Sequence, residues 1–139
     1  MFKRILLAVD GSEHAVHAAT VAGELARRMN SQLRIVIVYD PIPHYLGEPN
    51  LQFAISARLK EAQEILQRAS DAVGSTKDDQ DTEIIEGNPA EAIIELAKTH
   101  KSDLIVMGSR GLGKLAGLVM GSTSQKVVSH APCPVLIVR

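Results

Sequence analysis

The sequence predicts a single α/β domain over residues 1–139, with a parallel sheet of five strands and helices on both faces. Three observations support this class. Five short β-like runs alternate with helical stretches, which is typical of parallel strands joined by right-handed crossovers. The first run, 5–9, is almost continuously apolar, as a strand covered on both faces must be. The length also fits one domain, since domains usually have about 100–150 residues.

The first helix follows the turn Asp10-Gly11-Ser12, where Ser12 can cap it. Its apolar stripe consists mainly of small residues, so the helix can lie close to a sheet: Ala15, Ala18, Ala19, Ala22, Leu25, Ala26 and Met29. The second strand covers 33–39, and the proline-rich stretch 41–50 is predicted to be a loop. The second helix ends near Gly74, and its apolar residues are spaced alternately by four and three: Ile55, Leu59, Ala62, Leu66, Ala69 and Val73.

The third strand, 82–86, is the weakest of the five. A strong helix start follows it, with Asn88 as N-cap, Pro89 in the first helical position and Glu91 reaching back. The buried stripe of this helix is predicted to be Ile93, Ile94 and Ala97. The last two strands are short apolar runs, 104–107 and 134–138.

Composition and charge narrow the class of function. With 15 Lys and Arg against 16 Asp and Glu, the net charge is −1. Binding to a nucleic-acid backbone needs many neutralised phosphates, so we expect no nucleic-acid partner. No apolar run approaches the roughly 20 residues that span a bilayer, and the N-terminus has no signal-peptide pattern. We therefore expect a soluble, cytoplasmic protein with no membrane partner.

In a doubly wound sheet, ligands bind outside the carboxyl ends of the strands, where the strand order reverses. If the first strand is central, this point lies between strands one and four. Asp10 and the segment after Met107 would then share one crevice. Asp10 also has a plain interpretation as an Asx-turn residue, and its position at a strand end favours the binding role.

The segment 108–121 holds half of the chain's ten glycines. Glycine lets backbone N–H groups approach a ligand closely. Ser122-Thr123-Ser124-Gln125 follows as a capping box, with Ser122 as the predicted N-cap. A helix N-terminus after such a segment suits an anion, and the three hydroxyls would add donors. The alternative is a loop followed by an ordinary capped helix.

Two familiar phosphate-binding patterns almost fit this segment. Gly108-x4-Gly113-Lys114 matches the start of a Walker A loop, but Leu115 replaces the hydroxyl residue that binds Mg²⁺. Gly111-x-Gly113-x2-Ala116 matches the relaxed dinucleotide fingerprint, but no acidic residue follows it to bind a ribose. The sequence therefore argues against both kinds of site.

A third pattern fits without change: Gly108-x2-Gly111-x9-Gly121-Ser122. Together with the runs 5–12, 103–111 and 130–138, it resembles the universal stress protein family, in its ATP-binding branch, over the whole chain. The resemblance implies the strand order 3-2-1-4-5 and ATP, with or without Mg²⁺, at the switch point. It also implies a homodimer through the last strand, which would otherwise expose an apolar edge.

The same resemblance implies roles for individual residues. Asp10 would contact the adenosine end, and the backbone near Ala8, Val38 and Met107 would frame the base. The ribose and phosphates would be held by Gly108, Gly111, Gly121, Ser122, Thr123 and Ser124. For Arg110 and Lys114 the sequence leaves two alternatives open, a phosphate partner or a surface charge.

No nucleophile–base pair is evident in the sequence, so we predict an ATP-binding stress-response or signalling module with little or no turnover. The alternatives are a slow ATP hydrolase or nucleotidyl transferase of related fold, and a nucleotide-free dimeric interaction protein. His14 and His17 lie one helical turn apart with no third ligand nearby, which predicts a solvated helix face and no metal site. Cys133 is predicted to be an inert buried thiol.

Overall fold

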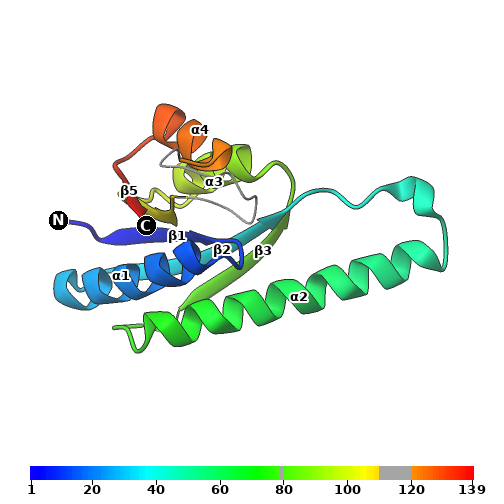
Figure 1. The fold of residues 1–139 in the computed structure, drawn as a ribbon. Coiled ribbons are helices and arrows are strands. Elements are labelled where there is room, and N and C mark those ends of the chain that lie inside the picture. Colours follow the sequence, from blue (N-terminus) through cyan, green and yellow to red (C-terminus); the bar gives the residue numbers. More distant parts are fainter. Residues whose placement is uncertain (79, 110–119) are drawn as a thin grey trace.

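A computed structural model of the chain describes residues 1–78, 80–109 and 120–139. Within these ranges, five parallel strands form one sheet in the order β3-β2-β1-β4-β5 (Figure 1). The strands are β1 (Arg4–Val9), β2 (Gln32–Tyr39), β3 (Asp81–Glu86), β4 (Leu104–Gly108) and β5 (Val135–Val138). The predicted class and strand order are confirmed.

Helices cover both faces of the sheet (Figure 1). One face carries α1 (Glu13–Met29) and α2 (Asn50–Val73), and the other carries α3 (Pro89–Thr99) and α4 (Ser122–His130). Successive strand side chains point to opposite faces. In β1, Ile5, Leu7 and Val9 therefore pack with α1 and α2, while Leu6 and Ala8 pack with α3 and α4. All five are buried, which explains the continuous apolar run.

α1 packs closely because its inner face is made of small residues. Those buried are Ala15, Ala18, Ala19, Ala22, Gly23 and Ala26. Ser12 caps the helix as predicted, since its Oγ accepts the N–H of Ala15 at 3.1 Å. Gly23 marks the contact with α2, because a Cβ there would lie 2.1 Å from the carbonyl oxygen of Val73. The small residues thus set the spacing between the helices as well as the distance to the sheet.

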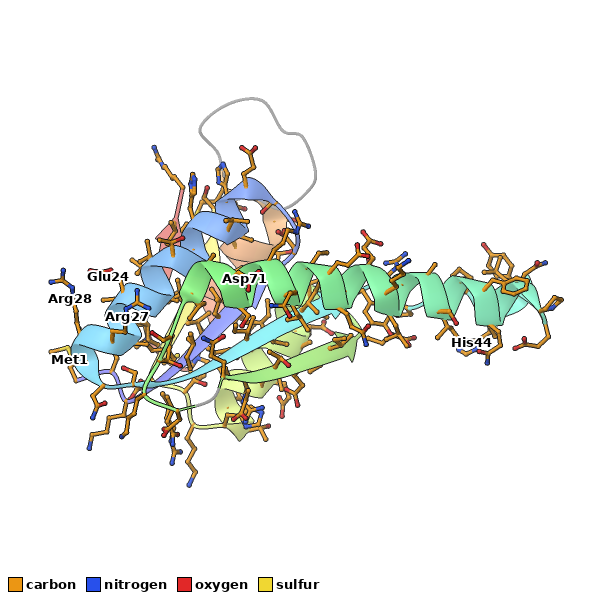
Figure 2. All side chains as sticks on the ribbon, turned by 90° about the horizontal axis from the view of Figure 1, so that it is seen from below. Met1, Glu24, Arg27, Arg28, His44 and Asp71 are labelled. Carbon is orange, nitrogen blue, oxygen red and sulfur yellow. The ribbon has the colours of Figure 1, made fainter. Side chains whose placement is uncertain are left out.

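Only the C-terminal half of α2 lies on the sheet. The helix extends well beyond the strands toward His44, away from Asp71 (Figure 2). The buried apolar residues of α2 are Ala62, Ile65, Leu66, Ala69 and Val73. Leu59 is 37% exposed and Ile55 is half-buried, so the first part of the apolar stripe is not covered by the sheet. Helical periodicity identifies the apolar face, but the sheet decides how much of that face is covered.

The loop predicted at 41–50 contains a short 3₁₀ helix, His44–Leu46, and α2 begins at its last residue, Asn50. Among the described residues, no helix is long and apolar enough to cross a membrane.

The start of α3 agrees with the sequence pattern. The Oδ1 of Asn88 accepts the N–H of Glu91 at 3.1 Å, and Pro89 stands in the first turn. The carboxylate of Glu91 lies 3.5 Å from the Nζ of Lys126 on α4. This ion pair connects the two helices that cover this face of the sheet.

Candidate functional site

The carboxyl ends of three strands meet at one edge of the sheet. Ala8 of β1 pairs with Met107 of β4 in the parallel register, so these two strand ends lie side by side. Val38 stands near the end of β2, Gly108 ends β4, and Asp10 directly follows β1. The structure thus brings five of the predicted site residues to the edge where such sheets bind ligands.

A cavity of about 170 Å³ opens at this edge beside α2. Asp10 and Val38 contribute to its wall, as predicted for the adenosine end. The other polar or charged lining residues are Tyr39, Asp40, Arg58 and Glu61. The Cζ of Arg58 lies 5.7 Å from the centre of the Tyr39 ring, within cation–π range. Carboxylates beside a flat cation can bind the hydroxyl and ring groups of a nucleoside.

These four lining residues were missed from the sequence. Tyr39 and Asp40 could have been found, because they end the second strand at the same edge as Asp10. Arg58 and Glu61 could not have been found, since the periodicity of α2 does not say which of its turns stands over the strand ends.

Asp10 has a structural role in this crevice. Its Oδ1 accepts the N–H of Ser12 at 3.0 Å, which makes an Asx-turn at the end of β1. The turn positions Ser12 to cap α1. The plain interpretation of Asp10 is therefore confirmed. The bond uses one of the two carboxylate oxygens, so the other is compatible with the predicted contact to a ligand.

Ser109, directly after β4, joins several elements. Its N–H donates to the carbonyl of Val138 on β5 at 2.8 Å, and its carbonyl accepts the N–H of Gly121 at 2.8 Å. Its Oγ lies 2.6 Å from the Nδ1 of His14 on α1. The residue is 7% exposed. These bonds hold the beginning of α4 and the N-terminus of α1 against the end of β4.

The two histidines of α1 therefore make specific contacts. The prediction of a solvated helix face is wrong for His14, whose ring is bonded to Ser109. His17 is exposed, yet its Nδ1 lies 3.1 Å from the carbonyl oxygen of Arg139. The two contacts join residues that lie 95 and 122 positions apart in the sequence. No local sequence pattern indicates contacts over such separations.

The start of α4 differs from the predicted capping box. The N-cap is Gly121, with φ −64° and ψ 160°, and Ser122 is already the first helical residue. The bond from the Gly121 N–H to Ser109 fixes that residue at the turn. Ser124 is buried, and its hydroxyl donates to the carbonyl of Gly108 at 2.9 Å. The hydroxyl proton of Ser124 is therefore engaged within the chain, and a contact of this residue with a nucleotide stays a prediction. The prediction of a Ser122 cap is wrong.

The first turn of α4 nevertheless presents backbone donors. The N–H groups of Ser122, Thr123 and Ser124 precede the first bond within the helix, which Gln125 makes to Gly121 at 3.0 Å. Such N–H groups have no acceptor in their own helix, and the helix dipole adds positive partial charge around them. Ser122 is exposed and Thr123 is half-buried. This turn can therefore bind an anion.

Packing alone explains why residue 108 is glycine. A Cβ at Gly108 would lie 2.8 Å from the Cβ of His14 and 2.9 Å from its carbonyl carbon. The close approach of α1 requires this glycine whether or not a ligand binds. Its contact with a nucleotide stays a prediction. The predicted site residues Arg110 and Gly111, and Lys114, lie outside the described residues.

In residues 1–78, 80–109 and 120–139, no group of three or more His, Cys, Asp or Glu side chains could hold a metal ion. Cys133 is half-buried, and burial raises the pKa of its thiol, helped by the negative charge of Asp103. A raised pKa is typical of an unreactive thiol, in agreement with the interpretation of this residue from the sequence.

Comparison with known proteins agrees with this geometry. The sequence profile of the Universal stress protein family matches residues 1–139. A universal stress protein of Thermus aquaticus is 49% identical over 139 residues, with 100% of both chains covered. The solved structure of UspA from Lactobacillus plantarum is 33% identical, with a TM-score of 0.87 over 99% of this chain and 98% of that one. A universal stress protein in complex with cAMP is 30% identical, with a TM-score of 0.71 over 99% and 97%. The chain described here therefore belongs to the universal stress protein family.

Proposed function

We propose that the chain binds an adenine nucleotide, ATP in the first place, across the carboxyl ends of β1, β2 and β4. One observation carries this proposal. The bond from the Gly121 N–H to the Ser109 carbonyl, at 2.8 Å, holds the first turn of α4, whose N–H groups have no acceptor in their own helix, beside the end of β4. An anion-binding turn thus stands at the same sheet edge as the polar cavity lined by Asp10 and Arg58.

In this proposal each half of the crevice takes one half of the nucleotide. The adenosine end lies at the cavity, framed by the backbone near Ala8, Val38 and Met107, with Asp10 near the ribose. The phosphates lie at the first turn of α4, which offers backbone N–H groups and the hydroxyls of Ser122 and Thr123. The 30% identical relative whose complex holds cAMP supports the choice of an adenine nucleotide.

Equilibrium binding of ATP, measured by calorimetry with and without Mg²⁺, tests the proposal. Gly121→Val puts a branched side chain at the phosphate end. The backbone of Gly121, at φ −64° and ψ 160°, accepts valine without strain. We expect at least about a tenfold loss of affinity, which equals about 1.4 kcal/mol. Unchanged affinity in this variant would place the nucleotide elsewhere.

A pair of serines on α4 provides a matched control. Ser122 stands in the first turn, whereas the hydroxyl of Ser129 donates to the Gln125 carbonyl at 2.9 Å in the last turn. Ser122→Ala should weaken ATP binding and Ser129→Ala should not. At the other end, Asp10→Asn keeps the oxygen that accepts the Ser12 N–H. A loss of affinity in Asp10→Asn without a loss of stability would assign the carboxylate charge to ligand binding.

We further propose that bound ATP is turned over slowly or not at all. Leu115 occupies the position of the Walker A hydroxyl that would bind Mg²⁺, and the Asp10 carboxylate is engaged in its own turn. Release of phosphate from ATP should stay well below about 1 s⁻¹, the lower end of the usual enzyme range. Steady release at or above that rate would favour the alternative, an ATP hydrolase.

A homodimer through β5 is the second part of the proposal. β5 is the last strand of the sheet and pairs with β4 alone in the described sheet. Its four residues, Val135–Val138, are apolar and only half-buried. An apolar edge strand is a liability unless it is covered or paired. Pairing with β5 of a second copy would satisfy its outer backbone groups through a two-fold contact.

A further inference from the structure

A second cavity lies at the opposite end of the sheet from the proposed nucleotide site. It has a volume of about 360 Å³ and stands at the amino ends of β1, β2 and β3, beside the C-terminus of α3. Its lining includes Arg4, Arg34, Asp81, His100 and Lys101, together with Ile5 and Leu33. A volume above roughly 300 Å³ is enough for a small-molecule ligand.

The position of Arg34 is unusual for a strand of this kind. It interrupts the apolar run of β2. It lies two positions before the buried Val36, so both side chains point to the face that α3 covers. Its side chain is 27% exposed, so the guanidinium is held in the cavity wall. It forms an ion pair with Asp81, whose Oδ2 lies 3.3 Å from the Nη2 of Arg34. The side chain of Asp81 is 70% exposed. Among the described residues, no second carboxylate pairs with this guanidinium.

The other two permanent cations of the cavity have no carboxylate partner among the described residues. The Nη1 of Arg4 lies 3.5 Å from the carbonyl oxygen of His100, a long contact with a neutral group. Lys101 is exposed at the end of α3 and forms no ion pair with a described residue. With Asp81 as the single acid in the lining, the cavity carries an excess of positive charge.

Two further acids stand near the cavity but outside its lining, Asp103 and Glu83. Asp103 uses its carboxylate to accept the backbone N–H groups of Lys3 and Arg4, at 2.9 and 3.0 Å. Glu83 does not line the cavity, and its Oε2 lies 3.8 Å from the Nε2 of His100. Arg4, Arg34 and Lys101 therefore surround the cavity with cationic donors, of which Arg34 is paired with Asp81 and Arg4 contacts a carbonyl oxygen.

We propose that this amino-end cavity binds a small polyanion, a molecule with two or more carboxylate or phosphate groups. Guanidinium groups match planar or tetrahedral oxyanions with paired donors. Cations on two strands and one helix end can hold more than one oxyanion at once. The proposal is independent of nucleotide binding, because the strands separate the two sites.

Amide chemical shifts of the isotope-labelled full chain test this proposal, with citrate and pyrophosphate as the probes. Binding should move the amides of Arg4, Leu33, Arg34, Lys101 and Ser102, with a dissociation constant below about 1 mM at 0.15 M NaCl. The tighter probe assigns carboxylate or phosphate as the preferred group. The absence of localised shifts up to about 10 mM of both probes would overturn the proposal. Shifts centred on residues 122–124 would overturn it too, because they would assign the anion to α4.

A charge-matched pair of variants separates a site from general attraction. Arg4→Gln combined with Lys101→Gln removes two cavity cations and leaves the Arg34–Asp81 pair intact. Arg28→Gln combined with Lys60→Gln removes two exposed cations from the helices on the other face of the sheet. The cavity variant should bind at least about tenfold more weakly and the control within about twofold of the parent. Equal weakening in both, with both spectra showing a folded chain, would mean that no site exists.

Discussion

The Nδ1 of His14 lies 2.6 Å from the Oγ of Ser109, across 95 positions of sequence. The contact joins the first turn of α1 to the residue that also bonds β5 and the start of α4. The edge of the sheet where we propose nucleotide binding is thus cross-linked by a side-chain bond from the opposite helical layer.

Removal of His14 should destabilise the chain. His14→Ala leaves the buried hydroxyl of Ser109 without this partner, so the free energy of unfolding should fall by about 1–3 kcal/mol in urea titrations. His17→Ala, at an exposed position of the same helix, should change it by less than about 0.5 kcal/mol. A double-mutant cycle with Ser109→Ala should show a coupling energy of at least about 0.5 kcal/mol. Purely additive losses would contradict a direct interaction.

Gly23 should be intolerant of even one methyl group. Its added Cβ would lie 2.1 Å from the carbonyl oxygen of Val73, which already accepts a hydrogen bond from the Nη1 of Arg27 at 2.6 Å. Alanine favours helix, yet Gly23→Ala should lower the free energy of unfolding by about 2 kcal/mol or more because α1 and α2 must separate. Thr20→Ala, on the exposed face of α1, is the control and should have little effect. A stabilised Gly23→Ala variant would show that the helices can move apart at no cost.

The thiol of Cys133 should react slowly while the chain is folded. Burial, and then the charge of Asp103, raises its pKa above the ordinary value of 9.0. At pH 8 the folded chain therefore holds less thiolate than the unfolded chain, and iodoacetamide should alkylate it several-fold more slowly than in urea. The neutral thiol also contributes to stability below pH 9, and this contribution is lost as the pH rises through the folded pKa. Unfolding curves of Cys133→Ala should lack that part of the alkaline decline; an identical decline in both chains would speak against it.

The outer edge of β5 should mediate dimer formation. The carbonyl of Pro134 accepts the N–H of Ile105 on β4 at 3.0 Å, and that of Val138 accepts the N–H of Ser109, just after β4, at 2.8 Å. Since alternate residues of a parallel strand face the partner strand, the backbone of Ile137 faces outward. Ile137→Pro removes this outward donor and leaves the bonds to β4 in place, as edge strands tolerate. Sedimentation equilibrium at micromolar concentration should give twice 15.0 kDa for the parent chain and 15.0 kDa for the folded variant.

A parent chain that sediments at 15.0 kDa would rule out this dimer. A variant that stays dimeric while remaining folded, judged by its circular dichroism, would assign the contact to another surface.

Much of the fold could be predicted from the sequence because it depends on interactions between residues that are neighbours in the chain. The continuous apolar run of β1, the cap at Ser12 and the Asn88-Pro89 helix start each depend on neighbouring residues, and each is found in the structure. Alternation of strands and helices was enough for the parallel class. The strand order and the crevice came from the family resemblance together with the switch-point rule. Together they predicted that Asp10, Val38 and Met107 lie at one edge of the sheet, and these residues do lie there in the structure.

Only the tertiary structure decided which polar groups of the crevice residues are engaged in contacts within the chain. Ser124 faces inward because the carbonyl of Gly108 stands beneath it, and Gly121 is the N-cap because Ser109 accepts its N–H. Residue 108 must be glycine because α1 passes too close for a Cβ. Arg34 and Lys101 form one cavity although 67 positions of sequence separate them, by their numbering. Such contacts depend on where whole helices come to rest, and helical or strand periodicity carries no information about that position.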